Sequence, residues 1–407
     1  MRRIADRYRD FFRQADVAAL VGVALVARMP FGMVGLAMLL FLREAFGSYA
    51  LAGSISGVYF VAMAIGAPIQ GRLIDRAGPV PTLLVTAVVH PAALLAILAA
   101  VQSGAGLSPV AVAAACAGAF APPTNVLTRT LWRHRFTAEE DRRRAFAVDA
   151  VMIELNLTLG PALVAGLVAG TGTTVAFGVA IVVTIASLWV FTTSPALKYV
   201  RAEAAGARTL LGPLADTRLL LVFAATFGLA TGIGFLEVGY PGYATALSAP
   251  ALGGVFLSLS SLGSAIGGAL FGGLALRAAI ERQFAAAAAL MTVPLALHYT
   301  LDATAAFAFV AFLAGALIAP CIACQSVLVS RLAPPRFITE AFTWSSTFIV
   351  AGLGAGMASG GWLIEAAGAK VPFLASAAAM GAVSLGALAM LRASGRREPQ
   401  TGGAKSP

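Results

Sequence analysis

The sequence predicts an all-α membrane protein whose twelve transmembrane helices form two six-helix bundles related by pseudo-two-fold symmetry. The first observation is composition: 59% of the 407 residues are hydrophobic and only 11% are charged. Soluble domains are nearer ~45–50% apolar and ~25% charged. With 18 acidic and 28 basic residues, the chain has too few charges to cover a soluble globule. Composition therefore disfavours a soluble enzyme, a disordered chain and a nucleic-acid-binding protein.

The second observation is the number of apolar runs long enough to span a bilayer, which takes ~20 residues. Twelve runs qualify, at 17–42, 48–70, 81–102, 108–128, 145–169, 172–193, 219–245, 249–274, 284–301, 304–330, 341–364 and 371–391. The longer polar segment 194–218 divides them into six plus six. The predicted organisation is an N-terminal bundle (1–193), a linker (194–218), a C-terminal bundle (219–391) and a tail (392–407) that we expect to be disordered. The apolar run that follows the basic N-terminus is too long for a cleaved signal peptide, so it is taken as the first span.

The basic residues predict the orientation in the membrane, because cytoplasmic loops carry an excess of Lys and Arg. With the N-terminus in the cytoplasm, 25 of the 28 basic residues fall in cytoplasmic segments. Only Arg43 and Lys370 lie on the outside. Both termini and residues 129–144 are therefore predicted to be cytoplasmic. Arginine outnumbers lysine by 25 to 3, which is typical of GC-rich bacterial genomes and indicates a bacterial cell membrane.

A weak internal repeat relates the two predicted bundles. The segment 66–73 aligns with 267–274 at an offset of 201 residues, and Ala117-Gly118-Ala119 aligns with Ala314-Gly315-Ala316. A proline follows shortly after both Ala-Gly-Ala segments. Two parallel repeats imply an axis along the membrane normal and a binding site between the halves.

One motif carries a family resemblance. Residues 71–78 read Gly-Arg-Leu-Ile-Asp-Arg-Ala-Gly, which matches the pattern G-x-L-x-D-R-x-G. On this motif the whole chain resembles the major facilitator superfamily of transporters. The resemblance implies a cytoplasmic gate motif that holds the halves together in the outward-facing state; its members are Gly71, Leu73, Asp75, Arg76 and Gly78. We expect Gly71 to allow close helix approach and Gly78 to permit the turn.

A second motif favours efflux. Gly160-Pro161 in the fifth span resembles the glycine-rich motif that drug/proton antiporters of this family carry around a Gly-Pro pair. Residues 28–32 of the first span, Arg-Met-Pro-Phe-Gly, also resemble bacterial efflux permeases of the superfamily.

Ionisable groups at bilayer depth are costly and are usually functional. Arg28 and Glu154 lie at similar depths in spans one and five, so we expect them to pair; the alternative is a fixed ion pair that only ties two helices. Asp149 serves either the cavity or the cytoplasmic gate. Glu237 in span seven is either functional or a carboxylate wetted from outside. The uncharged candidates for this proton or substrate site are Asn125, Asn156 and Gln325.

The other polar residues at membrane depth are interpreted as structural. His90 and His298 are expected to be hydrogen-bonded within peripheral helices rather than to relay protons. Glu365 and Asp302 fall at the outer ends of spans, where we expect solvation alone. The glycines of span eight are expected to serve close helix packing.

These features predict a secondary transporter and not an enzyme. It exports a small organic molecule in exchange for protons by alternating access. The alternatives are an uptake symporter or facilitator of the same fold, and a transport-inactive membrane sensor or scaffold. We expect the partners to be a small-molecule substrate, protons and the lipid bilayer, with a monomeric chain, no nucleic acid and no cofactor. Cys321 and Cys324 have metal-like spacing, but without a second pair they are expected to pack between helices and hold no metal.

Overall fold

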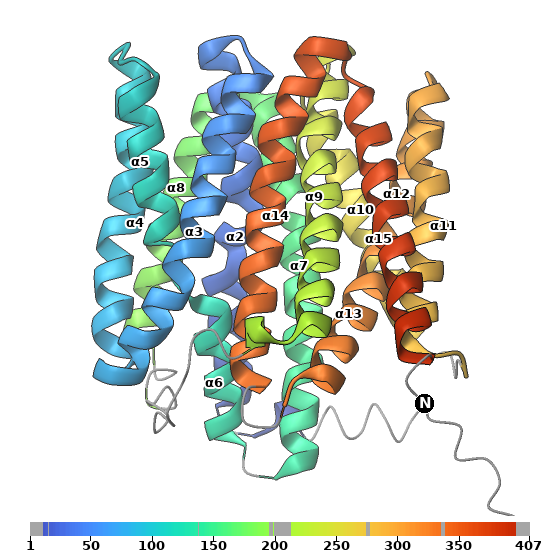
Figure 1. Ribbon diagram of the computed structural model, residues 1–407. Helices are drawn as coiled ribbons and strands as arrows, with labels where there is room; N and C mark the ends of the chain where they lie inside the picture. Colours follow the sequence, from blue (N-terminus) through green and yellow to red (C-terminus); the bar gives the residue numbers. More distant parts are fainter. Residues whose placement is uncertain are drawn as a thin grey trace, which may run out of the picture.

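The computed structural model describes residues 11–14, 16–136, 138–194, 198, 213–273, 277–334 and 338–395. All regular secondary structure in this part of the chain is helical (Figure 1). The helices of the first half are α2 (Val17–Phe46), α3 (Tyr49–Ala77), α4 (Pro79–Gln102), α5 (Leu107–Ala119), α6 (Thr124–Arg135), α7 (Glu139–Thr171) and α8 (Thr173–Thr193). Those of the second half are α9 (Thr217–Ala246), α10 (Leu252–Gly273), α11 (Ile280–Thr300), α12 (Thr304–Gly315), α13 (Ile318–Leu332), α14 (Ile338–Ala367) and α15 (Val371–Gly395), preceded by the short 3-10 helix η2 (Pro213–Ala215).

The predicted fold class is confirmed. Eleven segments of the described chain are long and apolar enough to cross a membrane, and the shorter apolar helix α5 begins the remaining expected span. The expectation of one continuous helix over 108–128 was wrong, because α5 ends at Ala119 and α6 begins at Thr124. Pro122 and Pro123 lie in this break; proline removes a backbone donor and disfavours helical geometry in the residue before it.

The tenth span is interrupted in the same way. The expected run 304–330 divides into α12 and α13, with Ala316 and Leu317 between them. Pro320 follows in the first turn of α13, and it has no N–H to donate to the carbonyl of Ala316, four residues earlier. The fourth and tenth spans are therefore both broken helices.

Helix packing shows the repeat. In the first half, α2 packs on α7 and α8, and α3 packs on α5; in the second half, α9 packs on α14 and α15, and α10 packs on α12. The glycines of the aligned segments make matching contacts. A Cβ added at Gly66 would overlap the carbonyl of Ala119, and one added at Gly267 would overlap the carbonyl of Ala316. The aligned residues therefore perform the same close packing in both halves, and the expectation for the glycines of the eighth span is confirmed.

The two ends of the bundle differ in how the halves meet. We call the end formed by the short connections at 47–48, 103–106, 172, 247–251, 301–303 and 368–370 the loop end; it is uppermost in Figure 1. The opposite end, which carries residue 17, is the N-terminal end. The two most extensive contacts between the halves are α3 with α14 and α7 with α10; α9 also touches α2 and α3.

Hydrogen bonds across the halves, where both partners are described, all lie at the loop end. Tyr49 contacts α9, Ser48 and Ala50 bond to Glu365, and Trp362 donates to Ser54 at 3.1 Å. Nearby, a Cβ added at Gly53 would overlap the carbonyl of Met357 in α14. These contacts close the loop end between the halves.

Candidate functional site

A buried ion pair joins three helices of the first half. Arg28 in α2 is 1% exposed, and its Nη1 donates to Oδ1 of Asp149 in α7 at 2.7 Å. Trp132 in α6 donates its indole N–H to the same carboxylate oxygen at 2.8 Å. Asp149 is 2% exposed, and apolar side chains of α2, α6 and α7 pack around the group. One carboxylate oxygen thus holds two helices against α7.

The structure gives Arg28 a carboxylate partner, Asp149, that the sequence did not predict for it. A side chain on a helix points back toward the helix N-terminus. The long arginine therefore reaches down to Asp149, which lies five residues, or about 7 Å at ~1.5 Å per residue, below Glu154. Residue 154 lies within α7, but its side chain is outside the described residues, so its role stays a prediction.

Several polar atoms at this site lack a partner among the described residues. Arg28 Nε and Nη2 are buried without a hydrogen bond, and so is Oδ1 of Asn156. The Nδ2 of Asn156 donates to the carbonyl of Leu25, one turn before Arg28, at 3.3 Å. A buried donor or acceptor left unpaired costs ~1–3 kcal/mol, and more if it is charged. Among the described residues, these atoms of α2 and α7 are therefore left to bind a water molecule, a side chain outside the described part or a polar group of a substrate.

Asn125 and Gln325 fall in different surroundings. Asn125 is half-buried in the first turn of α6, seven residues before Trp132 and thus on the same helix face. Gln325 is buried in α13 and donates to the hydroxyl of Ser345 in α14 at 2.8 Å. The structure thus brings Arg28, Asp149 and Asn156 together, and leaves Gln325 as a tie within the second half.

Glu237 lies half-buried on α9, just below the closed loop end. It comes one turn before Pro241 and two turns before Thr245, the two residues of α9 that contact Tyr49 in the first half. Residues four apart on a helix share a face, so Glu237 belongs to the face that meets the first half. Pro241 cannot donate to the carbonyl of Glu237, which leaves a second acceptor at the same position.

The gate motif is only partly described. Gly78 joins α3 to α4 with φ of 81°, a value that favours glycine, so the expected turn is confirmed. The expectation for Gly71 was wrong in this conformation, because a Cβ built there would meet nothing within 4 Å. Leu73 is exposed, while the side chains of Asp75 and Arg76 lie outside the described residues.

The Gly160-Pro161 pair lies where α7 meets two other helices. Gly160 packs against Gly32 of α2, and an added Cβ would lie 2.7 Å from the Cα of that residue. The carbonyl of Pro161 lies against Gly254 of α10 in the other half, which leaves no room for a Cβ there. The pair therefore sits at a junction within one half and between the halves.

The interpretation of the other polar residues was partly wrong. His90 and His298 are buried and contact the carbonyls of Ala117 and Pro294 through Nδ1, both at 2.8 Å, as expected. Glu365 is more than solvated, because it accepts from the Ser48 hydroxyl at 2.5 Å and the Ala50 N–H at 3.0 Å. Asp302 is exposed but also pairs with Lys370, whose Nζ donates to its Oδ1 at 2.6 Å.

Sequence reasoning did not identify Trp132 as part of the site. Trp132 lies in a basic segment between Arg129 and Arg133, so its burial was not evident; a buried indole N–H usually finds a partner.

Two halves related by a repeat, with ionisable groups buried between their helices, form the architecture of a secondary transporter. A model of the Major Facilitator Superfamily matches residues 20–336, and the chain belongs to this family. It is thus a transporter and not an enzyme. A search of curated proteins found no match.

Solved structures share the fold. The nucleoside transporter NupG superposes with a TM-score of 0.74 at 13% identity, over 92% of this chain and 98% of that one. A peptide transporter in complex with sulfate gives a TM-score of 0.68 at 16% identity, over 93% of this chain and 94% of that one. At this identity the likeness shows the fold alone.

Proposed function

We propose that this transporter exports a small organic molecule in exchange for protons by alternating access. The observation that carries the proposal is the buried contact of the Arg28 guanidinium with Asp149, in which Nε and Nη2 of Arg28 have no partner among the described residues. Ionisable groups buried within the membrane are expensive and usually functional. A fixed ion pair that only ties two helices together is the alternative.

In this mechanism, protons and substrate compete for carboxylates. Asp149 accepts from Arg28 and Trp132 at the α2–α7 contact, and Glu237 lies below the loop-end contacts of Tyr49. Opening of the loop end separates the helices around Glu237 and changes its hydration. A cationic or neutral amphiphile with a donor group can then replace a proton on these carboxylates, with Glu154 as a further candidate.

The orientation proposed for the chain rests on its basic residues. Both termini face the cytoplasm of a bacterial cell, which makes the loop end the outer end and this conformation the one sealed toward the outside. The gate motif, with Asp75 and Arg76, would form its contacts in the other conformation. Labelling a cysteine placed at Ala138 with an impermeant reagent tests the orientation, and labelling from outside the cell would overturn it.

Export is favoured over uptake by the antiporter-like Gly160-Pro161 pair. An uptake symporter or facilitator is the second candidate, because the fold is shared with a nucleoside transporter and a peptide transporter. The compounds to be tested for transport are therefore cationic and neutral amphiphiles, nucleosides and short peptides.

The test is flux into proteoliposomes that contain the full-length protein inserted with its N-terminal end outward, with and without a pH gradient. An exporter coupled to protons accumulates substrate only when the lumen is acidic, and Asp149→Asn abolishes that accumulation. Asp302→Asn, at an exposed carboxylate of the loop end, is the matched control and leaves it intact. Accumulation driven by an alkaline lumen supports the symporter, flux indifferent to pH supports the facilitator, and no flux of any compound supports a sensor or scaffold.

A further inference from the structure

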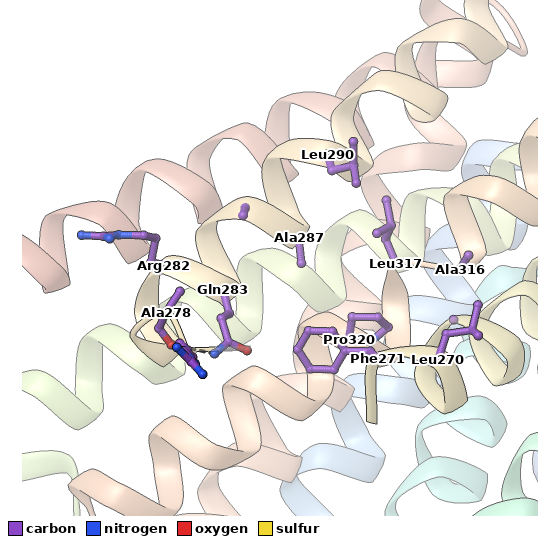
Figure 2. A pocket seen from close by; sticks show the side chains of 13 residues that line it. Leu270, Phe271, Ala278, Arg282, Gln283, Ala287, Leu290, Ala316, Leu317 and Pro320 are labelled. Atoms are coloured by element: carbon purple, nitrogen blue, oxygen red, sulfur yellow. Dashed lines mark hydrogen bonds between the residues drawn. The ribbon is translucent and has the colours of Figure 1, made fainter. Parts of the chain in front are cut away.

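The second half carries a cavity of about 620 Å³ that neither the ion pair nor the contacts between the halves use. It lies between α10, α11 and the break that separates α12 from α13 (Figure 2). The exposed apolar side chains Leu270 and Leu290 lie at its edge. Leu290 lies on α11, whose main helix contacts are with α12, α13 and α15 of its own half, so we take this side of the cavity to face the bilayer.

The lining of the cavity has a charged end and an apolar end. Arg277 lies in the connection between α10 and α11 at the N-terminal end, Arg282 lies in the first turn of α11, and both are exposed. Leu290 lies about 12 Å further along α11, at ~1.5 Å per residue. Figure 2 shows Arg282 at one end, with Leu317 and Phe271 toward the other. This order, basic at the surface and apolar at depth, matches a phospholipid.

The repeat indicates why this space is open. At the break between α5 and α6, Gln70 is buried and donates to the carbonyls of Ala119 and Ala121 at 2.8 and 3.1 Å. The residue aligned with Gln70 in the second half is Phe271, which cannot donate a hydrogen bond. The corresponding break at Ala316 and Leu317 instead borders the cavity.

We propose that this cavity binds one anionic phospholipid from the leaflet at the N-terminal end. Arg277 and Arg282 hold the phosphate, because guanidinium groups suit phosphate geometry. One acyl chain runs along α11 and fills the wedge beside the break of the tenth span. The lipid would thereby support α13 at the point where its helix is interrupted.

The experiment counts lipids bound to the full-length protein in detergent by native mass spectrometry. Phosphatidylglycerol and phosphatidylcholine with identical acyl chains are titrated separately. The wild-type protein is expected to retain one phosphatidylglycerol about tenfold more tightly than phosphatidylcholine. Arg277→Gln with Arg282→Gln removes that preference. The control pair Arg218→Gln with Arg331→Gln, which changes two exposed arginines outside the cavity, leaves it unchanged.

A second variant tests the apolar part. Ala286→Phe fills the cavity and keeps both arginines, so it should displace the lipid. If the Ala286→Phe protein does not fold, Leu290→Gln is tested in its place. Inorganic phosphate in about a hundredfold excess should leave the adduct intact, because the buried chain supplies much of the affinity. Three results would each overturn the proposal: an equal loss of the phosphatidylglycerol preference in the control pair, retention of the lipid by the Ala286→Phe variant, or displacement of the lipid by inorganic phosphate.

Discussion

The hydroxyl of Tyr49, the first residue of α3, donates to the carbonyl of Pro241 in α9 at 2.8 Å and lies 2.7 Å from the hydroxyl of Thr245. This group joins the two halves of the transporter at the loop end. Glu237 precedes Pro241 by one helical turn and lies further from the loop end. The same contact therefore links the closure of the loop end to the position of a membrane-embedded carboxylate.

Tyr49→Phe keeps the ring and removes these hydrogen bonds. Each is worth ~0.5–1.5 kcal/mol, so the population open at the loop end should rise about tenfold. The measurement is labelling, from the loop-end side, of a single cysteine at Phe227 in α9. Tyr299→Phe, at an exposed tyrosine of α11, is the control. Unchanged labelling of the Tyr49 variant would show that the contact does not hold the loop end closed.

The packing of the repeat predicts a pair of matched effects on stability. Gly66→Ala and Gly267→Ala should both destabilise, because each Cβ would overlap a backbone carbonyl that cannot move aside. Gly71→Ala has open space and should be neutral or stabilise by ~0.5–1 kcal/mol, the helix-propensity gain of alanine over glycine. Thermal unfolding of the purified variants measures this. A large loss of stability at Gly71, or none at Gly66 and Gly267, would contradict the packing.

Gly71→Ala also tests the gate motif. If α3 approaches the other half at Gly71 only in the alternative conformation, the substitution should slow transport while the free energy of unfolding of the present conformation is kept. Flux and thermal unfolding are measured on the same preparation. Full flux would show that Gly71 makes no close contact in either conformation.

The sequence predicts the fold well because hydropathy and basic residues act over whole segments. The breaks in the helices of the fourth and tenth spans were not predicted, because the apolar composition continues through them. The Pro122-Pro123 pair in the fourth span was a visible signal of a break in the sequence. The contact of Arg28 with Asp149 was not predicted, because Cα depth ignores the direction of a long side chain. The bond of Glu365 to Ser48 joins residues 317 positions apart, and no local pattern contains it.

Glu237→Gln tests the second carboxylate. A glutamine keeps the size and hydrogen-bonding capacity but cannot exchange a proton. Accumulation driven by a pH gradient should be lost, while substrate exchange at equal pH continues in part. Glu281→Gln, in the first turn of α11, is the control and should leave both rates unchanged. Retained pH-driven accumulation in the Glu237 variant would remove this residue from the coupling mechanism.

Single and double substitutions of Arg28 and Asp149 separate a role of this pair in proton coupling from a purely structural role. Breaking a buried pair by removing one partner typically costs ~3–5 kcal/mol, because the other charge stays buried and unpaired. Arg28→Ala or Asp149→Ala alone should therefore lower the thermal midpoint sharply. The double change Arg28→Met with Asp149→Leu removes both charges and keeps apolar volume, so folding should recover most of that loss. Trp132 then loses its acceptor, a cost of ~1–3 kcal/mol that Trp132→Phe in the same background relieves. If the pair couples protons to substrate, the folded double variant transports without response to a pH gradient. A double variant that folds and still accumulates substrate against its gradient would show that the pair only ties α2 to α7.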